Sequence, residues 1–175
     1  GVRKRVFCAS MADVFEGADT MPQKSRMVVH EARERLFDLI EGTPFLDWLL
    51  LTKRPDNARK ILGRGWFDDE LPSNIWLGTS VEDQATADER IPHLLRIPAK
   101  VRFLSCEPLL GDTDLTPWLW QCRMGCTDGD CCPGDCINPR SPIDWVICGG
   151  ESGKDARPMH PDWARSLRDQ CVDAR

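Results

Sequence analysis

The sequence lacks any apolar run long enough to cross a membrane. A bilayer-spanning helix needs roughly 18 to 20 consecutive apolar residues, so we expect no membrane-spanning segment and no membrane partner. The opening stretch, GVRKRVFCAS, carries charges, but no apolar segment of signal-peptide length follows it. The sequence therefore predicts a cytoplasmic protein.

An excess of positive charge is also missing, because 28 acidic residues outnumber 23 lysines and arginines and give a net charge of −5. A protein that coats nucleic acid needs a basic surface, so the composition leaves room only for a local basic patch. Hydrophobic residues make up 41% and charged residues 29% of the chain, as in ordinary globular proteins. The 175 residues predict one domain, 1–175, with a real core.

Five short apolar runs predict β-strands, because they are nearly continuous in apolar residues, like strands that are covered on both faces. They lie at residues 5–10, 45–52, 74–80, 101–106 and 144–150. Helical spacing of apolar residues occurs between most of the runs and after the last, at 24–42, 54–65, 81–97 and 160–174. Pro92 is expected to break or kink the third helix. This alternation predicts an α/β fold with parallel strands and right-handed crossovers.

Polar side chains follow every predicted strand. In strand order they are Ser10 and Asp13, with the apolar Met11 between them; Thr52, Lys53 and Arg54; Ser80, Glu82 and Asp83; Ser105 and Glu107; and Glu151 and Ser152. In parallel α/β folds these strand ends lie on one side, where ligand sites form. We interpret this side as a candidate site, although loops are polar in any fold.

The residue types on this side suit several ligand groups. Lys53 and Arg54 suit a phosphate or a carboxylate, unless each pairs with a nearby acid. Glu82, Glu107 and Glu151 can bind an amine or ribose hydroxyls, or act as acid or base. Because both charge signs are present, the substrate stays open between a small molecule and a nucleic acid.

The segment GGESG at 149–153 predicts a flexible turn, whose backbone N–H groups can hold an anion. Gly149 and Gly150 are therefore candidate binding residues, although tight turn geometry alone also explains them. The segment does not match the dinucleotide-binding fingerprint.

Nine cysteines are many for this length, but their odd number and the lack of an export signal argue against a complete disulfide framework. Four of them occur in apolar or helical surroundings, where cysteine usually behaves as a small buried hydrophobe. These four are Cys8, Cys106, Cys148 and Cys171.

The other five cysteines lie in a segment rich in Gly, Pro, Asp and Cys, which we interpret as an insertion at 117–142. They are Cys122, Cys126, Cys131, Cys132 and Cys136. Four thiolates on such a loop suit a tetrahedral zinc site, but the Cys-x3-Cys spacings differ from the usual zinc knuckles. Zinc, an iron–sulfur cluster and no metal all stay open, and the three scattered histidines add no ligand.

Five stretches of the chain, taken together, point to a known family. They are SMADVF (10–15), LLLTKRPDNA (49–58), IWLGTSVEDQATADERIPHLL (75–95), VRFLSCEPLLG (101–111) and DWVICGGESGKDARPMHPDWARSLRDQC (144–171). They resemble the phage-associated three-Cys-motif family, of the phage gene-product thirty-seven/sixty-eight type, whose function is unknown. The resemblance implies a (β/α) barrel of the radical-SAM kind, in which three closely spaced N-terminal cysteines look like ligands of a [4Fe–4S] cluster.

The chain departs from this pattern, because no run of three closely spaced cysteines occurs before residue 100. The resemblance therefore implies an internal fragment, a partial (β/α) TIM-type barrel, with the cluster cysteines upstream of Gly1. S-adenosylmethionine and a [4Fe–4S] cluster are the cofactors expected for the full-length protein. Side chains at the strand ends would line the cavity for cofactor and substrate.

The resemblance thus implies a phage- or prophage-type protein that acts as a radical-SAM-like enzyme. The catalytic candidates are Lys53, Glu107 and Glu151, and the cofactor-binding candidates are Thr52, Arg54, Ser80, Glu82, Ser105, Gly149 and Gly150. One alternative is a nucleic-acid- or partner-binding protein with a basic surface at Lys53, Arg54, Arg157, Arg165 and Arg168. The other is an interaction module stabilised by a metal in the insertion.

Overall fold

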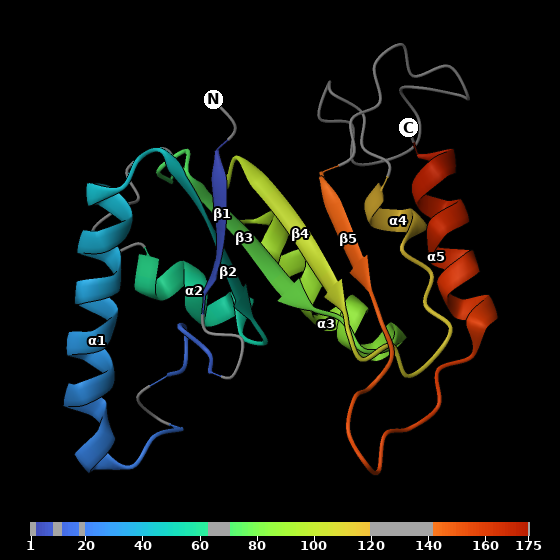
Figure 1. Cartoon of the computed structure of the whole chain (residues 1–175), viewed down its shortest axis with the longest axis horizontal. Helices are drawn as coiled ribbons and strands as arrows, with labels where there is room; N and C mark the ends of the chain where they lie inside the picture. The colour runs from blue at the N-terminus through green and yellow to red at the C-terminus, as the bar shows by residue number, and fades with distance from the viewer. Residues whose placement is uncertain (1–2, 9–11, 18–19, 63–70, 120–141, 175) are drawn as a thin grey trace.

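The computed structural model describes residues 3–8, 12–17, 20–62, 71–119 and 142–174. The strands are β1 (Lys4–Cys8), β2 (Leu46–Thr52), β3 (Ile75–Ser80), β4 (Val101–Cys106) and β5 (Trp145–Cys148) (Figure 1). The helices are α1 (Gln23–Gly42), α2 (Pro55–Leu62), α3 (Gln84–Leu95), α4 (Thr116–Leu119) and α5 (Pro161–Asp173). Where the chain is described, the predicted strands and helices are confirmed to within a few residues at their ends. The short helix α4 was not expected.

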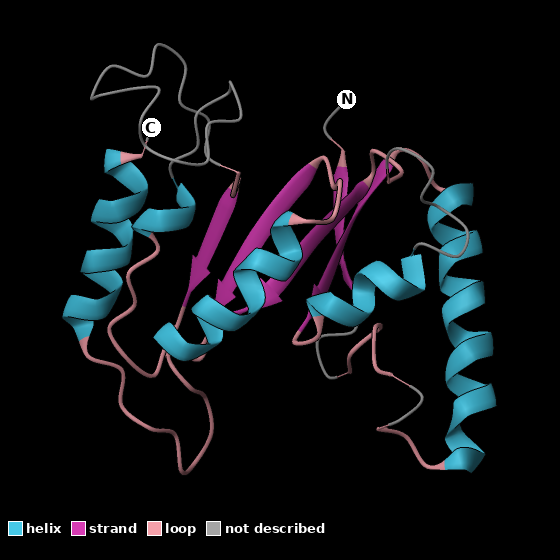
Figure 2. Cartoon of the chain, turned by 180° about the vertical axis from the view of Figure 1, so that it is seen from behind, coloured by secondary structure: helices cyan, strands magenta, loops and turns pink. Residues whose placement is uncertain are grey.

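The five strands form one parallel sheet in chain order, β1-β2-β3-β4-β5. Helices α1, α2 and α3 lie in the first three crossovers. Seen from behind, α2 and α3 lie against one face of the sheet, which we call the outer face (Figure 2). The sheet curls away from these helices, so its other side, the inner face, is concave. The predicted α/β fold is confirmed, and the curled sheet is consistent with part of a (β/α) barrel.

The main core lies between the outer face of the sheet and the helices. Leu50, Leu77 and Leu104 of three adjacent strands are fully buried there, together with Ile91 and Leu94 of α3. Burying one such side chain contributes about 1.5–3 kcal/mol relative to leaving it exposed. Helix packing on this face therefore holds the sheet in place.

The inner face carries a second set of apolar residues. Leu49 and Phe103 are buried, yet neither belongs to the main core. The guanidinium carbon of Arg5 in β1 lies 4.6 Å from the ring centroid of Trp76 in β3 and 5.7 Å from that of Trp145 in β5. Side chains from alternate strands meet in such layers inside (β/α) barrels. The contact across three alternate strands follows from the curl of the sheet.

Helix α3 begins with a capping box. The Asp83 carboxylate accepts a hydrogen bond from the Thr86 backbone N–H at 2.9 Å, and the Thr86 hydroxyl accepts one from the Asp83 N–H at 3.0 Å. These bonds satisfy donors that a helix start leaves unpaired. The break expected at Pro92 is absent, because α3 continues past it. Proline removes one hydrogen bond, but Ile91 and Leu94 are fully buried and anchor the last turn.

The prediction that Cys148 is buried was wrong. Cys106 is fully buried and Cys8 is half-buried, whereas Cys148 is exposed. Strand β5 is the last of the sheet, so its end has a neighbouring strand on one side only. The predicted insertion at 117–142 falls almost wholly outside the described residues, and so do its five cysteines.

No helix in the described ranges combines the length and apolar character that crossing a bilayer requires.

Candidate functional site

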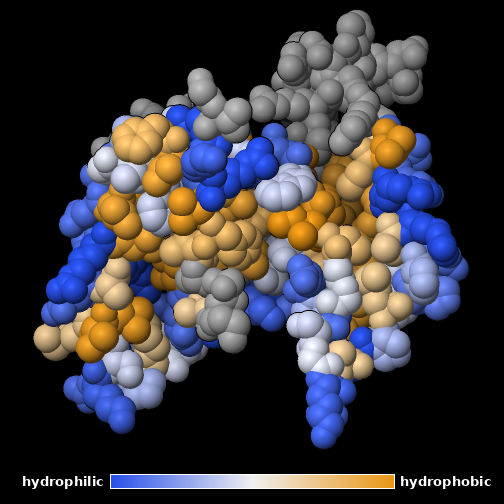
Figure 3. All heavy atoms as spheres, viewed as in Figure 1, coloured by the Kyte–Doolittle hydropathy of each residue, from blue (hydrophilic) through white to orange (hydrophobic). Residues whose placement is uncertain are grey.

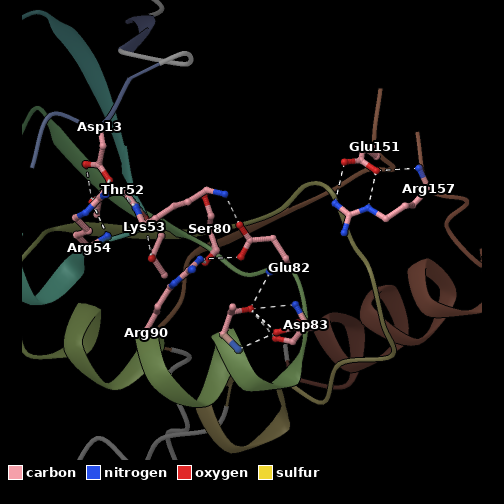
Figure 4. A network of polar contacts seen from close by, with 12 residues as sticks. Asp13, Thr52, Lys53, Arg54, Ser80, Glu82, Asp83, Arg90, Glu151 and Arg157 are labelled. Atoms are coloured by element: carbon pink, nitrogen blue, oxygen red, sulfur yellow. Dashed lines mark hydrogen bonds and ion pairs between the residues drawn. The ribbon is translucent and has the colours of Figure 1, made fainter. Parts of the chain in front are cut away.

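The carboxyl ends of the parallel strands lie at one edge of the sheet, which we call the strand-end edge. Its register pairs Thr52 with Thr79, and Ser80 with Ser105. Figure 4 shows the polar contacts formed by the residues that follow. The topology therefore brings the candidate side chains to the same edge, where they form separate groups of contacts.

Glu82 binds two cations at this edge. One carboxylate oxygen accepts a hydrogen bond from Lys53 Nζ at 2.6 Å, and the other accepts one from Arg90 Nη1 at 2.7 Å. The same Arg90 nitrogen donates to the carbonyl oxygen of Ser80 at 2.9 Å. Burial alone would raise the pKa of Glu82, but the Lys53 hydrogen bond and the charges of both cations hold that pKa below its ordinary value. Glu82 is therefore ionised at neutral pH.

The three groups leave one positive charge in excess, because Lys53 and Arg90 are two cations and Glu82 is one anion. Arg90 is mostly buried, whereas the Lys53 side chain is 58% exposed. Lys53 is thus the cation that a ligand can reach, and Glu82 fixes its position. The arrangement can receive an anionic group such as a carboxylate or a phosphate.

Asp13 joins the loop after β1 to the end of β2. Its carboxylate accepts hydrogen bonds from the Thr52 hydroxyl at 2.8 Å and from the backbone N–H groups of Lys53 and Phe15 at 2.9 Å. Arg54 Nη1 lies 3.3 Å from the same carboxylate. The side chains of Thr52 and Arg54 therefore hold two loops together.

Ser80 and Ser105 lie side by side on the inner face, just below the strand-end edge. Both residues are mostly buried, but neither hydroxyl has a hydrogen-bond partner among the described residues. In the same part of the chain, no polar side-chain atom is both fully enclosed and unpaired. Both hydroxyls are therefore unpaired among the described residues without being completely enclosed.

Glu107 follows β4, is exposed, and makes no hydrogen bond or ion pair with the described residues. A Cβ on Gly149 would lie 3.0 Å from Cδ of Glu107, so the missing side chain makes room for the carboxyl group. The Gly149 N–H already donates to the Cys106 carbonyl oxygen at 3.1 Å. A Cβ on Gly150 would meet Met159 at an ordinary 3.5 Å. Gly149 thus positions Glu107, whereas the space at Gly150 does not require glycine.

Glu151 forms an ion pair with Arg157, and this pair lies apart from the Lys53–Glu82 contacts (Figure 4). The guanidinium donates to both carboxylate oxygens and the Arg157 backbone N–H donates a third bond, each at 2.8 Å. These bonds lower the pKa of Glu151 to about 2. A carboxylate with so low a pKa does not suit proton transfer near neutral pH.

The basic surface considered as an alternative is paired with acids. Its five ion pairs are Lys53–Glu82, Arg54–Asp13, Arg157–Glu151, Arg165–Asp162 and Arg168–Asp169. Phosphate binding draws on cations whose charge is available to the backbone of a nucleic acid. These residues therefore do not form an unpaired basic patch.

Within the residues that the structure describes, no group of three or more His, Cys, Asp or Glu side chains could hold a metal ion. Burial raises the pKa of Cys106 to about 12, so its thiol is protonated and unreactive at neutral pH. Desolvation and the charge of Glu107 raise the pKa of Cys148. The zinc and iron–sulfur predictions concern cysteines outside the described residues and stay predictions.

Sequence reasoning missed Arg90 and the aromatic side chains below the edge. Arg90 lies inside a predicted helix. The one feature of the sequence that pointed to its contact was the opposite charge of Glu82, eight positions earlier. Trp76 and Trp145 were placed in strands, and counting back in steps of two from Ser80 would have put Trp76 on the inner face.

A family model described as "Protein of unknown function (DUF5131)" matches residues 2–175. The chain belongs to the DUF5131 family. No curated protein matches the chain, and no solved structure matches it. The family description names neither a ligand nor a reaction, so the phage and radical-SAM resemblances stay proposals for this DUF5131 chain.

Proposed function

We propose that this DUF5131 chain carries the ligand-binding edge of a radical-SAM-like (β/α)-barrel enzyme, in a protein of phage or prophage type. The observation that carries the proposal is the strand-end edge. There, parallel strands present the Lys53–Glu82 pair, two nearly buried serine hydroxyls and the carboxylate of Glu107, and the hydroxyls and this carboxylate have no partner among the described residues. This is the side on which (β/α) barrels bind their ligands.

The charges at this edge suit a ligand that carries both a cationic and an anionic group. Lys53 suits a carboxylate, and Glu107 suits an ammonium group or a hydroxyl. Ser80 of β3 and Ser105 of β4, which are paired in register, offer hydroxyl groups at the ends of their strands. The amino-acid part of S-adenosylmethionine has both charges, which supports this molecule as the ligand.

The described residues do not fit a [4Fe–4S] cluster, because they contain no group of three candidate metal ligands. We therefore assign no step of a reaction to such a cluster. The proposal rests on what the side chains of this chain do, which is to bind and orient the two ends of the ligand.

Isothermal titration calorimetry with S-adenosylmethionine tests the proposal on the purified chain. We expect saturable binding that Lys53→Ala and Glu107→Gln each weaken by roughly 10- to 150-fold, because each variant removes one charge-assisted hydrogen bond. Lys100→Ala and Glu89→Gln remove the same charges from exposed positions away from the edge and should leave binding unchanged. The absence of binding, or equal losses in all four variants, would contradict the proposal.

Metal analysis of the purified chain tests the interpretations of the cysteine-rich segment. Iron together with sulfide supports the enzyme, because it identifies a cluster. Zinc alone supports the alternative of a metal-stabilised interaction module. A chain with neither metal would remove both metal predictions for these cysteines.

A further inference from the structure

Arg90 of α3 reaches from its helix to the end of β3 and stays mostly buried, with 16% of its side chain exposed. One nitrogen, Nη1, donates to Oε2 of Glu82 at 2.7 Å and to the carbonyl oxygen of Ser80 at 2.9 Å. Figure 4 shows the side chain extending from the helix toward both acceptors. Arg90 therefore ties the Glu82 carboxylate to the strand from which Glu82 follows.

Glu82 is held at every other point as well. Its backbone N–H donates to the Thr86 hydroxyl at 3.0 Å, and its carbonyl oxygen accepts from the Leu110 N–H at 2.7 Å. Arg90 takes Oε2, so the one remaining acceptor, Oε1, points to Lys53 Nζ at 2.6 Å. A lysine side chain has many rotamers, and holding it in one of them requires a fixed partner. The order of contacts therefore runs from Arg90 through Glu82 to Lys53.

Arg90 also decides the net charge that a ligand meets. With Arg90 present, the two cations outnumber the Glu82 carboxylate by one. Without it, Lys53 and Glu82 would neutralise each other. The nearby Asp83 lies at the N-terminus of α3, where the helix dipole and the Thr86 N–H compensate its charge. Arg90 is therefore the group that leaves positive charge available beside Lys53.

The contacts of Arg90 lie in the middle of the sheet. Strand β3 pairs with β2 on one side and with β4 on the other, and α3 lies against the outer face (Figure 2). Figure 3 shows apolar side chains over the centre of the concave face and hydrophilic ones toward the carboxyl ends of the strands. The contacts that link Arg90, Glu82 and Lys53 therefore involve neither edge strand of the sheet.

We propose that Arg90 is a positioning residue of the strand-end edge: it holds Glu82 so that Lys53 stays in place and keeps its charge available to the carboxylate of S-adenosylmethionine. The inference rests on the proposed function for the identity of the ligand. Arg90 acts through Glu82 and does not touch the ligand. An arginine that only supported the fold would change stability and leave the affinity of the folded chain unaltered.

Isothermal titration calorimetry with S-adenosylmethionine tests this role on variants that circular dichroism shows to be folded. Arg90→Gln should weaken binding by about tenfold, as expected for groups that share one network of charges. Arg90→Lys should recover most of this loss, because both bonds come from one nitrogen and an ammonium group can replace it. Arg59→Gln removes an equal charge from the exposed side of α2 and should bind like the wild type.

A double-variant cycle tests whether Arg90 acts through Glu82. In the Glu82→Gln background, Arg90→Gln should change the affinity by less than about threefold, because no carboxylate is left for Arg90 to hold. The proposal is overturned if Arg90→Gln weakens binding equally in both backgrounds. It is also overturned if Arg90→Gln binds as tightly as Arg59→Gln, or if Arg90→Lys binds no better than Arg90→Gln.

A measurement without ligand separates this inference from the proposed function. Burial raises the pKa of Glu82, and the charge of Arg90 is among the interactions that lower it. Carbon-13 nuclear magnetic resonance, with Glu82→Gln identifying the signal, should therefore find a higher Glu82 pKa in Arg90→Gln than in the wild type. If the wild type does not bind S-adenosylmethionine, the proposed function fails. The titration then decides the role of Arg90, and an unchanged Glu82 pKa in Arg90→Gln overturns it.

Discussion

The two faces of the sheet are built from the same strands, yet they differ in what covers them. On the outer face, Leu50 and Leu104 are fully buried in the main core under the helices. On the inner face, Phe7 and Trp145 stay partly exposed, and Arg5 lies among the rings. The outer face therefore supplies stability, whereas part of the inner face stays exposed to solvent.

Truncating one side chain on each face tests this comparison most strongly. Leu104→Ala leaves a cavity in the fully buried core and should lower the free energy of unfolding by about 2–5 kcal/mol. Trp145→Ala removes a larger side chain from the more exposed face and should cost less. Urea unfolding of both variants measures the difference, and a larger loss for Trp145→Ala would reverse our assignment of the faces.

The next largest effect is expected at the strand-end edge. Glu82→Gln leaves the mostly buried Arg90 without its charged partner and should cost about 2 kcal/mol at neutral pH. The folded-state pKa of Glu82 is lowered from 4.5, so its carboxylate stabilises the fold above that pH. This stabilisation is lost as the pH falls through the lowered pKa.

The pH dependence of urea unfolding separates this electrostatic effect from a packing effect. The wild type and Glu82→Gln should differ most at neutral pH and converge below pH 4.5, as Glu82 takes up a proton. A difference that stays constant down to pH 3 would contradict an electrostatic origin.

A smaller effect is expected where the inner face is most tightly packed. A Cβ on Gly78 would lie 2.4 Å from the ring of Phe103, so Gly78→Ala forces the ring to move and should cost about 1.5 kcal/mol. Phe103→Leu offers more room, and the double variant should lose less than the sum of the single losses. If the losses in free energy of unfolding of the two single variants add up to that of the double variant, the Phe103 ring and the methyl group at position 78 do not compete for the same space.

The smallest effect is expected at the exposed pair of Glu151 and Arg157. The Arg157 side chain is 60% exposed and that of Glu151 is 28% exposed, and ion pairs at the surface contribute little. Glu151→Gln should lower the urea midpoint at neutral pH by less than Glu82→Gln does, because solvent screens the contacts that lower the pKa of Glu151. A drop as large as that of Glu82→Gln would contradict this ranking and would show that the turn at Glu151 supports the fold.

The strands and helices could be predicted because parallel strands covered on both faces have a recognisable, nearly continuous apolar pattern. The same continuous apolar pattern does not show which side chains lie on which face of the sheet. In LDWLLLT, Trp48 packs into the main core and Leu49 lies on the inner face. Because both residues are apolar, the segment alone does not indicate which of them faces the helices. The exposure of Cys148 was missed for a related reason, because strand order within the sheet decides which strand is last.

At the candidate site, the sequence indicated which residues lie at the strand ends but not which residues they contact. Lys53 and Glu82 were both chosen as strand-end residues, but their ion pair depends on the spacing of β2 and β3 and on the position of α3. Glu151 was chosen for its carboxylate, whereas its partner Arg157 lies six residues further along the same loop. Contacts between separate elements are set by packing, which a single sequence does not display.

The space above Gly78 constrains how relatives can diverge. The ring of Phe103 fills the volume that any side chain at position 78 would need. Side chains at these two positions therefore compete for the same space between β3 and β4. A relative that gains a methyl group at the first position must shrink the residue at the second. Across the family, we therefore expect the residues at positions 78 and 103 to covary in size.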